Sequence, residues 1–267
     1  MAERFTMSNF AKTLKALLGR GSGAPKGFIP ITDFDPQDIF IAGYPKSGNT
    51  WFQELIAAVI YGVMPEFSPP GLVQDLVPDV HFKAFYQRYN TPMFFKTHSL
   101  PHPNYKRVVC LLRDGRDAMV SYYHYSSAIE KKPLDFLQMV RDGPALGPCK
   151  WHEHVKAWQA NPFGASLITI RYEDLKQDAT RELMRFCEFA KIERDPKLVR
   201  EMAEATVFEK MQSKEARQKI YLADGWPKDK LFRRRGQVGS YKDEMPPEVL
   251  AAFLAEAGQT LHACGYS

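Results

Sequence analysis

A short stretch, "GYPKSGNT", joins an apolar run to a predicted helix and combines glycines, hydroxyls and a lysine. It matches the phosphate-loop pattern G-x-x-x-x-G-K-[ST] at Gly43, Gly48 and Thr50. Asn49 stands where that pattern has its lysine, and the chain carries a lysine three positions earlier, at Lys46. In nucleoside-triphosphate sites the lysine reaches the β- and γ-phosphates. A lysine inside the turn instead meets the terminal group or the bridging oxygen of a shorter anion.

A second charged position follows the apolar run "VVCLL", which ends in Arg113. Triphosphate sites hold Mg²⁺ with an acidic residue at such a strand end. A guanidinium there cannot hold a metal ion, but it binds phosphate well because it is a permanently charged, forked donor. The residues therefore favour a ligand with two separate anionic groups.

Several segments, in order, resemble the PAPS-dependent sulfotransferases, especially the cytosolic ones; PAPS is 3′-phosphoadenosine 5′-phosphosulfate. "YPKSGNTW" resembles the family's 5′-phosphosulfate loop, and "FFKTH" resembles its catalytic strand end. "RVVCLLRDGRDAMVSYYH" resembles the 3′-phosphate segment, and "RYEDL" is similar to the family's "YEDL/M". "TVFEKM" and "FRRRGQVGSYK" resemble its two C-terminal nucleotide segments. The matches run from about residue 38 to 242, most of the chain.

The segments that carry these residues alternate between strand and helix. Four segments are predicted to be strands: "DIFIAGY", "MFFKTH", "RVVCLL" and "SLITIRY". Helices are predicted after the loop, from "RDGRDAMV" onward, over "ATRELMRFCEFAK", near 195–213 and from Pro246 to Ala263. This alternation predicts an α/β fold with a central, mostly parallel β-sheet flanked by helices. The resemblance implies a P-loop-like sulfotransferase domain over residues 28–267, preceded by an N-terminal helix and linker over 1–27.

The resemblance also implies a set of nucleotide contacts. The loop residues expected at the 5′-phosphosulfate are Tyr44, Pro45, Lys46, Ser47, Gly48, Asn49 and Thr50, and those expected at the 3′-phosphate are Arg113, Ser121, Arg234, Arg235 and Gly236. Trp51 and Phe208 would stack on adenine, with Tyr172 and Thr206 at its edge. The alternatives are a solvated basic loop at "FRRRG" and ordinary core aromatics. Two departures from the family are Asn49 for Thr and "GSYK" for "GDWK".

Three side chains are candidates for the chemistry. His98 suits a general base because imidazole titrates near the working pH, although a lone histidine at a strand end is often structural. Lys46 would stabilise the bridging oxygen as the S–O bond breaks. Lys96 lies two residues before His98, on the same side of a strand, where it would contact the sulfonyl oxygens.

The acceptor pocket is the part on which the sequence is least informative. The aromatic-rich run "HFKAFYQRY" contributes Phe82 and Phe85, and Tyr125 follows the 3′-phosphate segment. They predict a partly apolar pocket for a small molecule; a satellite hydrophobic cluster is the alternative. The family's dimer signature, K-T-V-x-x-x-E, does not follow "GSYK", which leaves the oligomeric state open.

The composition of the chain limits which classes of protein and ligand are possible. The chain has 267 residues, 45% of them hydrophobic, enough for one large domain. The net charge of +5 suits an anionic ligand or a solvated basic surface, and is too small to indicate nucleic acid. Four dispersed cysteines indicate neither a metal site nor a disulfide framework, and the histidines of "HEH", 152–154, are expected at the surface. We find no apolar run of about 18 residues and expect a soluble, cytoplasmic protein without a membrane span.

Together these residues predict a sulfotransferase that moves the sulfonyl group of PAPS to a hydroxyl or amine of a small molecule. It would act by in-line displacement without a metal and release adenosine 3′,5′-bisphosphate (PAP). Two rivals remain: a P-loop kinase or NTPase, which would turn over ATP with magnesium, and a non-catalytic module, which would bind PAPS without transfer.

Overall fold

The computed structural model describes residues 24–64, 67–69, 71–143, 147–218, 226–227 and 229–267. Most of the predicted N-terminal helix and linker, residues 1–27, lies outside these ranges. The proposed division at residue 28 therefore stays a prediction.

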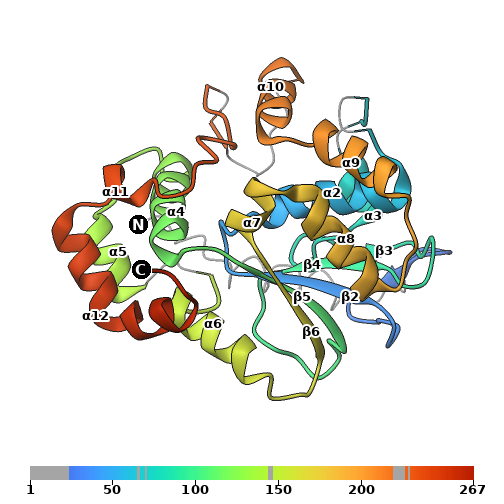
Figure 1. Cartoon of the computed structure of the whole chain (residues 1–267), viewed down its shortest axis with the longest axis horizontal. Helices are drawn as coiled ribbons and strands as arrows, with labels where there is room; N and C mark the ends of the chain where they lie inside the picture. Colours follow the sequence, from blue (N-terminus) through green and yellow to red (C-terminus); the bar gives the residue numbers. More distant parts are fainter. Residues whose placement is uncertain (1–23, 65–66, 70, 144–146, 219–225, 228) are drawn as a thin grey trace.

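Four parallel strands form the central sheet in the order β4–β2–β5–β6. They are β2 (Ile39–Gly43), β4 (Phe94–Thr97), β5 (Arg107–Leu112) and β6 (Ser166–Arg171). All four were predicted as strands, and the α/β fold with a parallel sheet is confirmed (Figure 1). A separate antiparallel pair, β1 (Ile29–Pro30) with β3 (Phe85–Tyr86), was not predicted, because two-residue strands leave no periodic pattern.

Both faces of the sheet are buried, and successive residues of β2 alternate between them. Ile39 and Ile41 pack into one core cluster, whereas Phe40 and Ala42 pack into another. The first cluster joins the sheet to α2 (Asn49–Tyr61), α8 (Ala179–Ala190) and α9 (Pro196–Ala205). The second includes Trp158 of α6 (Trp151–Ala160), which covers the opposite face. Burial on both sides explains the continuously apolar strands.

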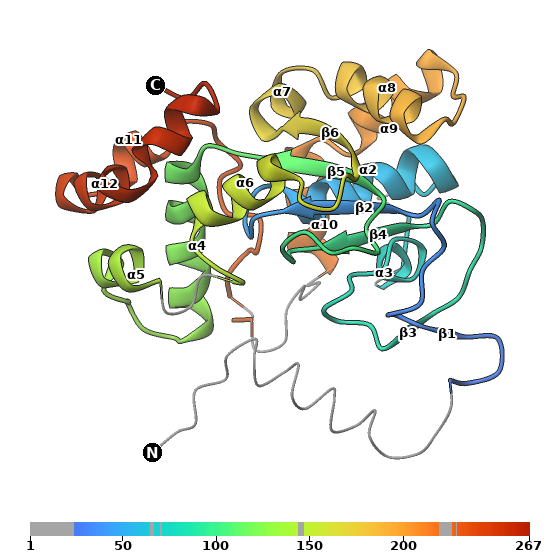
Figure 2. The ribbon, with the colours of Figure 1, turned by 90° about the horizontal axis from the view of Figure 1, so that it is seen from below.

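A third core cluster lies beside the sheet. It joins α4 (Gly115–Ile129), α5 (Phe136–Asp142) and α12 (Pro247–Ala263). Figures 1 and 2 show these helices with α11 (Tyr241–Glu244) at one end of the molecule and α2, α8 and α9 with α3 (Leu72–Leu76) toward the other. Helices α7 (Tyr172–Gln177) and α10 (Phe208–Gln218) lie nearer the middle. Helix α3 was not among the predicted helices, because a single helical turn has no sequence periodicity.

The parallel sheet decides where a site can form. Strands β2, β4 and β5 end at Gly43, Thr97 and Leu112, so the residues after them meet at one edge. In open α/β sheets, ligands bind outside the carboxyl ends of the strands. The phosphate-like loop, "KTH" and Arg113 all follow these ends.

Candidate active site

A cavity of about 270 Å³ opens at this edge of the sheet. Most of the predicted site residues line it: Pro45, Lys46, Gly48, Asn49, Thr50, Trp51, Phe82, Lys96, His98, Arg113, Ser121, Tyr125, Tyr172, Phe208, Arg234, Arg235 and Gly236. The lining residues that the sequence reading missed are Gln74, Tyr122, Phe232, Arg233, Gln237 and Ser240. The fold thus brings together residues predicted from widely separated segments.

The loop after β2 presents the N-terminus of α2 to the cavity. Gly48, the N-cap of α2, has φ 92°, and no side chain caps this helix end. A Cβ on Gly48 would lie 2.7 Å from the Tyr172 ring, so both backbone angle and space require glycine here. The free N–H groups of a helix N-terminus attract an anion. Ser47 Oγ is buried in this loop and has no hydrogen-bond partner among the described residues.

The Asn49 side chain stabilises the loop after β2 by a hydrogen bond inside it. Its Nδ2 donates to the Tyr44 carbonyl at 2.9 Å, and a Cβ on Gly43 would overlap its Oδ1. These contacts give Asn49 a structural task beside its predicted role. The Tyr44 ring is buried against Tyr122 and His154 and does not line the cavity. Tyr44 therefore supports the loop from the core, contrary to the prediction of a nucleotide contact.

Lys46 has the left-handed backbone, φ 71°, and its ammonium lies over two rings. Nζ is 4.5 Å from the centroid of Tyr125 and 4.2 Å from that of Phe232. Burial, together with the charges of Arg113 and Lys96, lowers the pKa of Lys46 to about 7. Cation–π contacts hold the ammonium in place but neutralise no charge. A bound anion would supply that missing charge.

Arg113 joins the loop to the C-terminal part of the chain. Its Nη1 donates to the Lys46 carbonyl at 2.9 Å and its Nη2 to the Gln237 carbonyl at 3.1 Å. The guanidinium also lies 4.3 Å from the Tyr172 ring centroid. Its Nε is buried and has no partner within the described residues. Two of the five N–H donors of Arg113 are thus used, and the Nε donor is among those left for a ligand.

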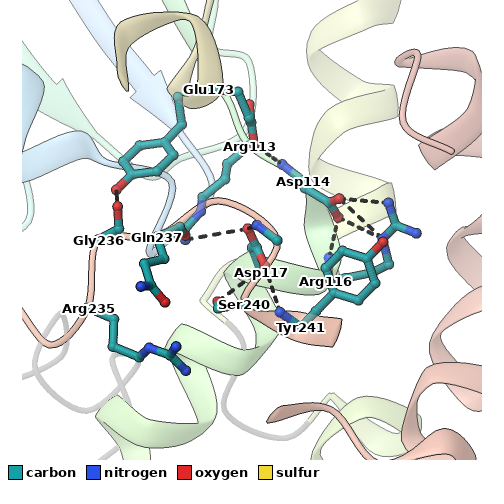
Figure 3. Close-up of polar contacts among 12 residues, drawn as sticks. Arg113, Asp114, Arg116, Asp117, Glu173, Arg235, Gly236, Gln237, Ser240 and Tyr241 are labelled. Carbon is teal, nitrogen blue, oxygen red and sulfur yellow. Dashed lines mark hydrogen bonds and ion pairs between the residues drawn. The ribbon is translucent and has the colours of Figure 1, made fainter. Parts of the chain in front are cut away.

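Asp117 fastens the neighbouring segment to α4, as Figure 3 shows. Its fully buried carboxylate accepts from Gly239 N at 2.7 Å, Tyr241 N at 2.9 Å and Ser240 Oγ at 3.2 Å. Arg113 Nη2 lies 3.8 Å from Asp117 Oδ2. The sequence reading missed Asp117; an acidic residue in the first helical turn was its only local signal.

The two arginines predicted at the 3′-phosphate are paired with an internal carboxylate. Glu244 accepts from Arg234 at 2.6 and 2.9 Å, from Arg235 at 2.7 Å, and contacts His124 Nε2 at 2.8 Å. Burial raises the pKa of Glu244, but the arginine hydrogen bonds outweigh it and the pKa is lowered. Arg233, between the partly buried Phe232 and Arg234, instead pairs with Glu54 and Glu215, which anchors this segment to α2 and α10.

His98 points one ring nitrogen at the backbone. Nδ1 lies 2.8 Å from the Gly43 carbonyl oxygen, which can only accept, so Nδ1 carries a proton and Nε2 holds the lone pair of the neutral ring. Burial lowers the pKa of His98 to about 3, helped by the charge of Lys96. Lys96 Nζ in turn pairs with the buried Asp79 at 2.9 Å. His98 is therefore neutral at pH 7, the state a general base needs.

The predicted adenine contacts differ in detail from the expectation. Trp51 Nε1 donates to the Thr206 carbonyl at 2.8 Å, and its ring packs edge-on to Tyr172 at 5.8 Å. The Thr206 hydroxyl donates to the Met202 carbonyl at 2.9 Å and is fully buried, so the predicted edge contact by this hydroxyl is not supported. Phe208 lies against Gly236, where a Cβ would come within 2.6 Å of the ring.

Aromatic side chains line part of the cavity. Phe82, 54% exposed, and Tyr125 are among the lining residues, while Phe85 lies in β3 and is not. A run of aromatics does not reveal which members a short strand turns away from a cavity, and the acceptor role of all three stays a prediction. Trp226 stacks behind Tyr125, with ring centroids 5.5 Å apart.

The expectation for "HEH" was wrong for one of its two histidines. His154 of "HEH" is buried, not exposed; its ring packs on Tyr44 and Trp158, and burial lowers its pKa to about 4. The described residues contain no group of three or more His, Cys, Asp or Glu side chains that could hold a metal ion. No helix in the described ranges is long and apolar enough to cross a membrane.

Comparisons with known proteins agree with this geometry. A family model described as "Sulfotransferase domain" matches residues 36–265. Mouse sulfotransferase 1E1 is 25% identical over 252 residues, covering 86% of this chain and 85% of that protein. Retinol dehydratase solved with androsterone and the inactive cofactor PAP superposes with a TM-score of 0.67, at 21% identity, over 86% of this chain and 82% of that one. Mouse sulfotransferase SULT7A1 complexed with PAP gives a TM-score of 0.63, at 21% identity, over 86% and 85%.

Proposed function

The chain belongs to the sulfotransferase family and is an enzyme of that class, and on this premise we propose that it transfers the sulfonyl group of PAPS to a hydroxyl or amine of a small, partly apolar molecule. PAP is the expected second product. The PAP-bound relatives support this choice of donor.

The observation that carries the proposal is a cavity lined, from two segments of the chain, by groups that can bind anions. The α2 N-terminus and Lys46 follow β2, and Arg113 and Ser121 follow β5. Two buried polar atoms, Ser47 Oγ and Arg113 Nε, lack partners among the described residues. Buried polar groups are rarely left unpaired in proteins, so these atoms favour a ligand with phosphate oxygens at both places. That requirement fits PAPS, which carries a 5′-phosphosulfate and a 3′-phosphate.

When bound, PAPS supplies a sulfonyl group whose S–O bond to the 5′-phosphate breaks during transfer. His98 Nε2 accepts the proton of the attacking hydroxyl, because Nδ1 is committed to the Gly43 carbonyl. Lys46 stabilises the negative charge on the departing oxygen. Lys96, held by Asp79, contacts the sulfonyl oxygens. Anionic charge beside His98 and Lys46 raises both pKa values from about 3 and about 7.

The acceptor is proposed to be a small molecule with an apolar ring. The aromatic side chains of Phe82, Tyr125 and Phe232 surround this part of the cavity. Retinol dehydratase, a structural neighbour, was solved with androsterone. A volume of about 270 Å³ lies near the lower end of the range for small-molecule pockets, about 300–1,000 Å³.

The test is transfer of radiolabelled sulfate from PAPS to a panel of phenols, sterols, terpenoid alcohols and arylamines. His98→Ala should abolish transfer, since it removes the base, while the affinity for PAP measured by calorimetry stays unchanged. The matched control is His102→Ala, a substitution of an exposed histidine outside the cavity lining. Full activity in His98→Ala would remove His98 from the mechanism, and wild-type protein that neither binds PAP nor transfers sulfate would refute the proposed function.

A further inference from the structure

The backbone at His98 is held by a second histidine. His98 N donates to His81 Nε2 at 3.0 Å. The two imidazole rings are nearly parallel, with 11° between their planes and centroids 5.9 Å apart. Sequence spacing gave His81 no role, because seventeen residues separate the two histidines and only the fold brings them together.

His81 is itself fixed by a short extension of the sheet. Lys96 N donates to the Pro78 carbonyl at 2.8 Å, and Val80 N donates to the Lys96 carbonyl at 3.0 Å. These two bonds lay the strand-like segment at Asp79 beside β4. Asp79 then accepts from His81 N at 2.9 Å while its other oxygen pairs with Lys96. The element that carries Lys96 and His98 therefore also fixes the residue that contacts His98.

The hydrogen bond defines the state of the His81 ring. A backbone N–H only donates, so Nε2 must carry a lone pair and the neutral ring has its proton on Nδ1. Burial lowers the pKa of His81 and the Lys96 charge adds to this, with Asp79 opposing. The Thr97 hydroxyl, 3.5 Å from Nε2, is the remaining polar group near this nitrogen. A neutral His81 can accept the bond at neutral pH.

Two contacts then converge on one residue. His81 holds the His98 backbone, and the Gly43 carbonyl holds its ring. We propose that His81 is a positioning residue for sulfonyl transfer, which keeps His98 Nε2 directed at the acceptor. The inference rests on the proposed function. His81 does not itself line the cavity and contacts it through His98, so its effect should fall on turnover.

The experiment compares His81→Leu, His81→Gln and the exposed-site control His102→Leu. A displacement of about 1 Å in a reacting group can lower the rate about 100-fold, so kcat of His81→Leu should fall by up to this factor. KM for PAPS and the affinity for PAP should not change. Gln Oε1 has a reach similar to that of imidazole Nε2 and also accepts, so His81→Gln should recover most of kcat. His102→Leu should match the wild type.

A second measurement needs no variant. The ¹⁵N shifts of the imidazole nitrogens in the wild-type protein should show His81 neutral and protonated on Nδ1. A proton on Nε2 would overturn the inference, even if His81→Leu failed to fold.

The remaining outcomes separate the two proposals. Wild-type protein without transfer activity removes the proposed function and this inference together. Active wild type with an unchanged kcat in His81→Leu overturns the positioning role alone. Equal losses of kcat and PAP affinity, without rescue by His81→Gln, would show general damage to the fold and also overturn it.

Discussion

Lys46 shows how much of the site depends on one residue. Its φ of 71° is unusual for a residue with a Cβ and costs about 1–2 kcal/mol. Two hydrogen bonds help the loop to tolerate this strain. Asn49 Nδ2 donates to the Tyr44 carbonyl, and Arg113 Nη1 donates to the Lys46 carbonyl. The strained backbone directs the ammonium between Tyr125 and Phe232, toward the cavity and away from the core.

The lowered pKa of Lys46 predicts a pH dependence. The pKa is about 7 in the free protein, so Lys46 is charged below pH 7 and loses its charge as pH rises. Because the charged form binds the anion, kcat/KM for PAPS should fall about tenfold per pH unit well above pH 7. Lys46→Arg keeps its charge at these pH values, so in this variant the alkaline fall should vanish. An alkaline limb near pH 7 that persists in Lys46→Arg would mean that another group titrates.

At the scale of elements, one contact decides whether the C-terminal segment reaches the cavity. Segment 236–241 has no strand or long helix of its own and follows the arginines of residues 233–235. Its backbone N–H groups at Gly239 and Tyr241 bond to Asp117 of α4, and Arg113 holds the carbonyl of Gln237 (Figure 3). The start of α4 therefore supplies both a predicted phosphate ligand and the anchor for the segment that completes the site.

Asp117→Ala tests this anchor. Hydrogen bonds to a charged group contribute about 1.5–3 kcal/mol each, so loss of the carboxylate should release the segment and weaken PAP binding at least tenfold. Calorimetric titration with PAP measures the affinity, and circular dichroism checks that the fold is retained. The control is Asp142→Ala, which removes an exposed carboxylate at the end of α5. Equal PAP affinity in Asp117→Ala and Asp142→Ala would contradict the role of the anchor.

On the scale of the whole molecule, the cavity is shared between the two groups of helices. Trp51, Tyr172 and Phe208 come from α2, α7 and α10, whereas Ser121 and Tyr125 come from α4 at the other end (Figures 1 and 2). A ligand that contacts both groups stabilises the folded chain as one unit. Arg234 and Arg235, which were predicted to bind the 3′-phosphate, form ion pairs with Glu244.

Thermal unfolding measures this stabilisation. A ligand at 100 times its dissociation constant adds about 2.7 kcal/mol, which for a chain of this size raises Tm by roughly 5–10 °C. PAP should produce this shift, and AMP at the same concentration, which lacks the 3′-phosphate, should produce a much smaller one. A larger shift with ATP and magnesium than with PAP would contradict the two-anion site and revive the kinase alternative.

Much of the fold was predictable because its signals are local. The strands "DIFIAGY" and "RVVCLL", the helix after Gly48 and the order of the segments all depend on neighbouring residues. Lys46, His98 and Arg113 were predicted in the same way, since each lies within three residues of a strand end in a recognisable segment. For that reason the family and the parallel sheet could be predicted, and both are confirmed.

The rest depends on contacts between residues far apart in the sequence, which packing alone selects. Glu244 pairs with Arg234 and Arg235, two of the predicted phosphate ligands. Asp117 binds a segment more than a hundred residues away. His81 contacts His98 only because the sheet is extended at Asp79. The Thr206 hydroxyl bonds to a carbonyl of α9, and its predicted contact with adenine stays a prediction, whereas the surface position expected for His154 was wrong because α6 turns it toward the core. A residue type states which bonds a side chain can make, but the tertiary structure decides which partner lies within reach.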